Sequence, residues 1–117
     1  LQQRAKDHAH PWDLGKDFEQ AAIISPIVIK PEGALLQQGA IELSVNQTMK
    51  QSSNLSLMIW SVAELISDLS RYYRLLPGDL IYTGTPDGVG PVVPGDCLTG
   101  HIEGVGRVVA NITAPLA

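Results

Sequence analysis

The stretch AIELSV, residues 40–45, alternates apolar and polar side chains and is the clearest structural signal in the chain. Every second residue of an extended backbone projects to the same side, so one side of this stretch would carry only apolar groups. Those groups are Ile41, Leu43 and Val45. The alternation therefore predicts a half-buried β-strand, from which the neighbouring segments can be placed.

Two hairpins are predicted, one beside this strand and one near the C-terminus. Asn46-Gln47 would form the first turn, with residues 48–51 returning as a strand, although the pair lacks the glycine that strengthens such turns. In the second hairpin, Gly104-Val105-Gly106 would join strands near Cys97–Glu103 and Arg107–Thr113. Both hairpins favour an antiparallel arrangement.

Two Pro-Gly-Asp triplets, at residues 77–79 and 94–96, predict turns, because proline fixes φ and glycine accepts a positive φ. Each triplet precedes an apolar run, so each is expected to open a strand, the first over Asp79–Thr83. Ala21–Ile29 is a further strand candidate. Pro26 would confine it to a sheet edge or a bend, because proline has no N–H to donate.

The longest predicted helix covers Leu55–Leu75. Its apolar residues recur at spacings of three and four, as one buried helical stripe requires: Met58, Val62, Leu65, Ile66 and Leu69. Asn54 or Ser56 would cap its N-terminus, and a short helix is expected within Arg4–His10. Together these elements predict an α+β fold that is mostly β with one main helix.

The composition is that of one globular domain. The chain has 117 residues, 44% of them hydrophobic, and a net charge of −4. Nucleic-acid binding through phosphates needs a basic surface that this chain lacks, and no apolar run approaches the ~20 residues that span a bilayer. Cys97 is the single cysteine, so we expect a buried structural thiol and a reducing, cytoplasmic location.

The segment best suited to binding a ligand is YTGTPDGVGP, residues 82–91, with three glycines, two prolines and two threonines. Glycines let backbone N–H groups approach an anion, and a threonine hydroxyl adds a donor of adjustable direction. The same composition is equally typical of a wide surface turn. No lysine follows the last glycine and no helix is expected there, which excludes the common phosphate and dinucleotide loops.

Lys16 is a second candidate, within PWDLGKDFE at residues 11–19. Packing by its aromatic neighbours could fix the lysine where it reaches an anionic substrate, although most lysines are simply solvated. His8 and His10 form a His-x-His pair, but such a pair needs a third ligand to hold a metal, so we expect none there. We expect His101, in the late hairpin, to be exposed.

These segments together resemble the fumarylacetoacetate hydrolase family. TGTPDGVG at residues 83–90, flanked by the two Pro-Gly-Asp triplets, resembles the most recognisable segment of that family. Pro11-Trp12 followed by Lys16 and Phe18 resembles its lysine segment. The resemblance covers nearly the whole chain and is closest to the acylpyruvase and fumarylpyruvate hydrolase branch.

The resemblance implies a mixed β-roll with one main helix and an enzyme that hydrolyses a carbon–carbon bond in acylpyruvates, with fumarylpyruvate as the leading substrate. In the family, Mg²⁺ or Mn²⁺ on carboxylates binds the 2-oxo acid end and stabilises the departing enolate. A lysine adds positive charge, and a water activated by a general base attacks the distal carbonyl. A homodimer acting on a small 2-oxo acid is implied.

The resemblance also assigns roles to particular residues. Lys16 corresponds to the catalytic lysine, and Thr85 to the threonine that contacts the substrate carboxylate. Gly84 would contribute backbone groups to the same contact, and Gln2 corresponds to a glutamine that touches the substrate.

The metal ligands of the family, two glutamates and an aspartate, precede the position that matches Leu1, and so does the His–Glu pair that activates water. We therefore expect residues 1–117 to be the C-terminal part of a catalytic domain whose upstream part is absent, with no metal ligand in this chain. Two alternatives stay open. One is a decarboxylase or isomerase of a 2-oxo dicarboxylate in aromatic catabolism, and the other is a non-catalytic, truncated scaffold.

Overall fold

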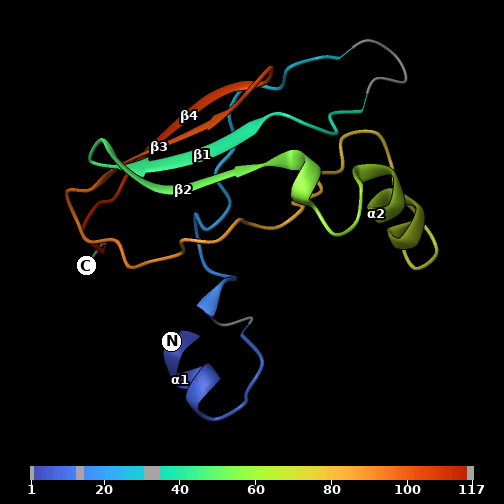
Figure 1. Cartoon of the computed structure of the whole chain (residues 1–117). Helices are drawn as coiled ribbons and strands as arrows, with labels where there is room; N and C mark the ends of the chain where they lie inside the picture. The colour runs from blue at the N-terminus through green and yellow to red at the C-terminus, as the bar shows by residue number, and fades with distance from the viewer. Residues whose placement is uncertain (1, 13–14, 31–34, 116–117) are drawn as a thin grey trace.

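One antiparallel sheet of four strands forms the centre of the computed structural model, which describes residues 2–12, 15–30 and 35–115 (Figure 1). The strands follow the order β2-β1-β3-β4 across the sheet. Their bounds are Ala40–Val45 for β1, Thr48–Asn54 for β2, Cys97–Ile102 for β3 and Gly106–Asn111 for β4. The α+β class and both predicted hairpins are confirmed.

The strand register gives the sheet an apolar face and a polar face. Leu43 of β1 pairs with Gly100 of β3, and these two positions share the apolar face. On the opposite face Glu42 pairs with His101, which in turn pairs with Arg107 of β4. The alternation predicted for β1 is therefore present, but all of its residues are half-buried because neither face is fully covered by the described part of the chain.

The turn between β1 and β2 forms without glycine. Asn46 and Gln47 both have positive φ, 49° and 69°, as the hairpin twist requires. The exposed Asn46 side chain hydrogen-bonds to the segment that starts β3: its Nδ2 donates to Asp96 Oδ1 at 2.8 Å, and its Oδ1 accepts from the Cys97 N–H at 2.9 Å. The first hairpin is thus tied to the start of β3.

The main helix, α2, is Val62–Leu69. The predicted range Leu55–Leu75 is too long at both ends. A separate 3₁₀ turn at Leu55–Leu57 precedes the helix, and Met58 is extended, with φ −61° and ψ 131°, which interrupts the helical path. The apolar spacing across residues 58–69 could not reveal this break, because it reports which side chains share a face and not whether the backbone is continuous.

The cap of α2 is Ser61. Its side chain accepts from the Glu64 N–H, and the Glu64 carboxylate accepts from the Ser61 N–H at 2.7 Å. This capping box satisfies two backbone donors and starts the helix there. The prediction that Asn54 or Ser56 caps the main helix is wrong, because Asn54 caps the 3₁₀ turn by accepting from the Ser56 N–H.

Both Pro-Gly-Asp triplets form the predicted turns. Asp79 Oδ2 accepts from the Leu76 N–H at 2.8 Å, and Asp96 Oδ2 accepts from the Val93 N–H at 2.9 Å. Only the second triplet opens a strand, namely β3. Within the described residues neither Asp79–Thr83 nor Ala21–Ile29 forms a strand, because a strand needs a hydrogen-bonded neighbour and these extended segments have none here.

A short helix forms near the N-terminus, but as α1, Gln2–Asp7, it begins and ends earlier than the predicted range Arg4–His10; it lies away from the sheet (Figure 1). Among the described residues no hydrophobic side chain is buried, and large apolar groups such as Ile29 and Ile59 are more than nine-tenths exposed. Cys97 is half-buried, not buried as expected, because it begins a strand at the end of the sheet. His101 is exposed, as predicted.

None of the helices in the described residues has the length and apolar character that spanning a bilayer requires.

Candidate functional site

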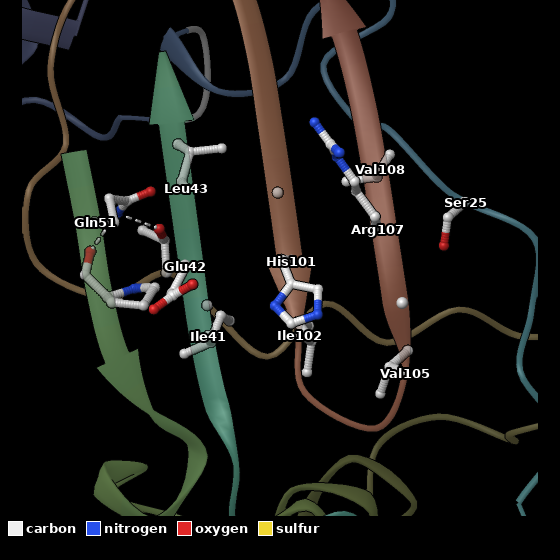
Figure 2. Close-up of a pocket in the computed structure, with 15 residues that line it drawn as sticks. Ser25, Ile41, Glu42, Leu43, Gln51, His101, Ile102, Val105, Arg107 and Val108 are labelled. Carbon is white, nitrogen blue, oxygen red and sulfur yellow. Dashed lines mark hydrogen bonds between the residues drawn. The ribbon is translucent and has the colours of Figure 1, made fainter. Parts of the chain in front are cut away.

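A hollow of about 230 Å³ lies between the apolar face of the sheet and the segment Gly84–Pro86. Its floor is made largely of aliphatic side chains from β1, β3 and β4, which Figure 2 shows as sticks: Ile41, Leu43, Ile102 and Val108. Gln51 stands at its edge with dashed hydrogen bonds leaving its side chain (Figure 2). Thr85, the predicted substrate contact, lines this hollow.

The segment that carries Thr85 is anchored to the sheet by one side chain. Gln51 Nε2 donates to Thr85 Oγ1 at 3.0 Å, to the Pro86 carbonyl at 2.7 Å and to the Asp87 carbonyl at 3.2 Å. Gln51 is 8% exposed and is the one buried residue in the described part of the chain. The position of the Thr85 hydroxyl therefore depends on β2.

A second contact fixes the same segment. The register of β1 and β2 shifts after the pair Leu43–Gln51, which leaves Lys50 as an extra, bulged residue. Gly88 lies against this bulge: a Cβ added to it would stand 2.1 Å from the Lys50 carbonyl oxygen, and its φ is +97°. Only glycine fits both the space and the conformation.

Gly84 has a φ of +100°, in the region that favours glycine, although an added Cβ would meet nothing within 4 Å. Backbone conformation, not crowding, therefore selects glycine here. Gly84 lines the same hollow as Thr85, so these two candidates lie together. Gln2, the third predicted substrate contact, lies at the first position of α1, and its side chain is outside the described part of the structure.

Lys16 lines a different hollow from the two that Thr85 lines. Its side chain is exposed, with Nζ 5.7 Å from the centre of a Trp12 ring, and it lines this hollow with Phe18 and Tyr82. Tyr82 precedes Thr85 by three residues, which in extended chain is about 10 Å. The structure thus places Lys16 near the start of the Thr85 segment without bringing the two side chains into one cavity.

No described group of three or more His, Cys, Asp and Glu side chains could hold a metal ion. The rings of His8 and His10 are 5.7 Å apart, and His8 Nδ1 lies 2.8 Å from the Arg4 carbonyl oxygen. The pair has no third ligand among the residues described.

Two carboxylates of the described residues have a lowered pKa, and both take part in local backbone structure: Asp96 in the turn before β3 and Glu64 in the cap of α2. The pKa of Asp96 is held below its ordinary value by the Val93 N–H, then by the Asn46 side chain and the charge of Lys50. The pKa of Glu64 is lowered by the hydrogen bonds that it accepts from Ser61. Neither group lines the hollow beside Thr85.

The sequence pattern did not single out Gln51 as a site residue. A regular register from the turn at Asn46-Gln47 would place Lys50 opposite Leu43, and the bulge at Lys50 puts Gln51 there instead. The turn signal alone therefore could not have found Gln51, whose burial among hydrogen-bond partners depends on the bulge.

The chain belongs to the fumarylacetoacetate (FAA) hydrolase C-terminal family, whose profile matches residues 1–113. It is 54% identical over 112 residues to a fumarylpyruvate hydrolase of Ralstonia sp, spanning 96% of this chain and 58% of that protein. It is 34% identical over 105 residues to an oxaloacetate tautomerase of Escherichia coli (strain K12), spanning 89% of this chain and 48% of that protein.

The crystal structure of fumarylpyruvate hydrolase from Pseudomonas aeruginosa in complex with Mn²⁺ and pyruvate has the same fold, with a TM-score of 0.89 and 39% identity. The match covers 98% of this chain and 49% of that one. The chain therefore spans about half the length of the relatives it matches. The family resemblance and the fold class expected from the sequence are confirmed.

Proposed function

We propose that the complete protein containing this chain is a hydrolase of acylpyruvates, with fumarylpyruvate as the leading substrate and Mg²⁺ or Mn²⁺ as cofactor. The observation that carries the proposal is the anchored segment Gly84–Asp87 over an apolar hollow, in a chain 54% identical to a fumarylpyruvate hydrolase. The Mn²⁺ and pyruvate bound by the Pseudomonas aeruginosa enzyme support the cofactor and the 2-oxo acid.

In this proposal Thr85 and Gly84 hold the substrate carboxylate, and Gln2 makes a further substrate contact. Hydrolysis adds water across the carbon–carbon bond. The distal carbonyl becomes a carboxylic acid, and the pyruvate part leaves as an enolate that then takes a proton. Negative charge grows on oxygen during this cleavage, and the Lys16 ammonium stabilises it.

The residues described here do not fit a metal site by themselves. We propose that the metal ligands belong to polypeptide outside residues 1–117, which form the C-terminal part of the catalytic domain. Assembly as a homodimer and a cytoplasmic location are part of the same proposal.

Isomerisation or decarboxylation of a 2-oxo dicarboxylate is the second candidate. The identity to an oxaloacetate tautomerase of Escherichia coli favours it, and such reactions use the same enolate chemistry. No residue of this chain separates the two activities. A non-catalytic scaffold is less well supported, because a scaffold need not keep Lys16, Thr85 and the glycine-rich loop together.

Product analysis tests the proposal. The complete, Mn²⁺-loaded protein is incubated with fumarylpyruvate, and products are followed by ¹H NMR. We expect fumarate and pyruvate in equal amounts, loss of turnover after chelation, and recovery when Mn²⁺ is returned. Unchanged fumarylpyruvate in the presence of folded, metal-loaded protein would contradict the proposal.

A further inference from the structure

The hydrogen bonds of Gln51 anchor the segment Thr85–Asp87, and they also determine how the Gln51 amide is oriented. Its Nε2 lies within hydrogen-bond distance of three acceptors, namely the Thr85 hydroxyl oxygen and the carbonyls of Pro86 and Asp87. Carbonyl oxygens only accept, so the group facing them must be the amide nitrogen and not the amide oxygen. The orientation of the Gln51 amide is thereby settled by its partners.

This orientation determines the direction of the Thr85 hydroxyl. A hydroxyl has one hydrogen to donate and lone pairs that accept. Because the Gln51 amide donates to Oγ1 at 3.0 Å, the Thr85 hydrogen cannot point at Gln51 and is left for another acceptor. A hydroxyl held in this way is a preorganised donor.

The backbone around Gln51 keeps this arrangement in register. The bulge at Lys50 precedes Gln51 directly, and Gly88 packs against the carbonyl of Lys50. The segment is therefore held at Thr85–Asp87 by the amide and at Gly88 by close backbone contact. Bulges often re-aim a neighbouring side chain beside a functional site.

We propose that Gln51 is a positioning residue that makes the Thr85 hydroxyl a hydrogen-bond donor toward the carboxylate of a 2-oxo acid. The inference rests on the proposed function, because it takes the carboxylate as the acceptor. An ionised carboxylate can only accept hydrogen bonds, and its negative charge strengthens the bond that it accepts from such a donor. Gln51 itself does not touch the substrate.

The test is a double-mutant cycle in the complete, Mn²⁺-loaded protein, read as the Kd for pyruvate by calorimetry. Gln51→Met keeps the length of the side chain and removes its donor. Thr85→Val removes the hydroxyl, Thr85→Ser keeps it, and Ser52→Ala is a control on the exposed side of β2.

We expect Thr85→Val to weaken pyruvate binding roughly tenfold or more, the usual range for a hydrogen bond to a charged group. Gln51→Met should weaken it about fivefold or more when residue 85 is Thr or Ser, and by less than twofold when residue 85 is Val. Such non-additivity shows that Gln51 acts through the hydroxyl. Ser52→Ala should bind pyruvate like the wild type.

If Gln51 only holds the segment Thr85–Asp87 in place, the result is different. Gln51→Met would then weaken pyruvate binding by the same factor in the Thr85→Val background as in the wild type, which overturns the proposal. Gln51→Asn keeps the amide but withdraws it by one methylene, so it replaces Gln51→Met if the latter does not fold. Unchanged pyruvate affinity in Gln51→Asn also overturns the proposal.

Two different outcomes distinguish a failure of the role of Gln51 from a failure of the proposed function. Normal pyruvate binding by the wild type, with a Thr85→Val defect but no effect of Gln51, removes only the role of Gln51. A wild type that neither binds pyruvate nor cleaves an acylpyruvate removes the proposed function, and the inference falls with it.

Discussion

Lys16 is the residue on which the proposed chemistry depends most. We expect Lys16→Ala in the complete protein to lower kcat for acylpyruvate hydrolysis by ~10²-fold or more, because a charge that stabilises developing negative charge is lost. Steady-state kinetics measure this. Lys6→Ala is a matched control, because Lys6 Nζ also lies over a Trp12 ring, at 5.2 Å. Equal kcat values for Lys16→Ala and the wild type would remove Lys16 from the mechanism.

Thr85 is expected to act in binding. Thr85→Val deletes a contact made to the carboxylate before and during reaction, so it should mainly raise KM and leave kcat within a few-fold of the wild type. Thr85→Ser, which keeps the hydroxyl, should restore most of the affinity. A fall in kcat at unchanged KM would argue against a carboxylate-binding role.

Single residues were predictable from the sequence where their own type carries the signal. Gly84 has the positive φ that a glycine-rich segment suggests, and Thr85 lines a hollow beside it. Gln51 was not predictable in the same way, because its burial comes from strand pairing and from a segment 34 residues further along the chain. Long-range contacts of this kind leave no local pattern.

The turn at Pro94-Gly95-Asp96 is the element whose stability should depend most clearly on pH. The folded-state pKa of Asp96 lies below its ordinary value of 3.8, chiefly because its carboxylate accepts from the Val93 N–H. A lowered pKa means that the ionised form stabilises the folded state. This contribution is complete above the unfolded-state value and is lost as pH falls through the lower folded-state value.

Thermal unfolding of the complete protein checks this dependence. Asp96→Asn should lower Tm near neutral pH, and its deficit relative to the wild type should shrink once pH falls below 3.8. Glu19→Gln, on an exposed segment, serves as the control. A deficit that stays constant across this range would show that the charge of Asp96 does not matter.

The capping box of α2 allows the loss of stability in a cap variant to be predicted, because the free-energy contribution of such caps is known. Ser61→Ala removes the acceptor for the Glu64 N–H and should destabilise the complete protein by about 1 kcal/mol. Ser67→Ala lies within the same helix and away from the cap, so it should be neutral or slightly stabilising. Chemical denaturation compares the two variants. Equal midpoints would mean that the capping box does not hold the helix.

Helices and strands were predictable where their signals and partners lie close together in the sequence. The alternation in β1 and the turn signals of both hairpins were enough to predict four strands, because the two strands of a hairpin supply each other's hydrogen bonds. Ala21–Ile29 and Asp79–Thr83 have strand-like composition but no strand partner within the described residues. Composition reports which residues tolerate an extended backbone and cannot supply that partner.

The molecule as a whole exposes more surface than a folded protein of its mass. Its accessible surface is 9787 Å², against about 6,200 Å² expected for a folded monomer of 12.6 kDa. Its radius of gyration is 16.0 Å, against about 13 Å for a compact chain of similar length. These values support the proposal that further polypeptide of the same enzyme completes the core.

The isolated chain of 117 residues should therefore behave as an incompletely packed protein. We expect it to bind the dye ANS and to unfold without a sharp transition, because its apolar face is only partly covered in the described part of the chain. The complete protein should bind little dye and unfold cooperatively. Fluorescence and calorimetry on the two preparations make the comparison. Cooperative unfolding of the isolated chain without dye binding would contradict the proposal that it is part of a larger domain.

The most direct test of the proposed function is the ratio of two specificity constants in one preparation of the complete, Mn²⁺-loaded protein. kcat/KM is measured for fumarylpyruvate hydrolysis and for oxaloacetate tautomerisation under the same conditions. Acylpyruvate hydrolysis as the main activity requires the larger value for fumarylpyruvate, with loss of this activity in Lys16→Ala. A larger value for oxaloacetate, with little or no cleavage of fumarylpyruvate, would contradict it and identify the protein as a tautomerase.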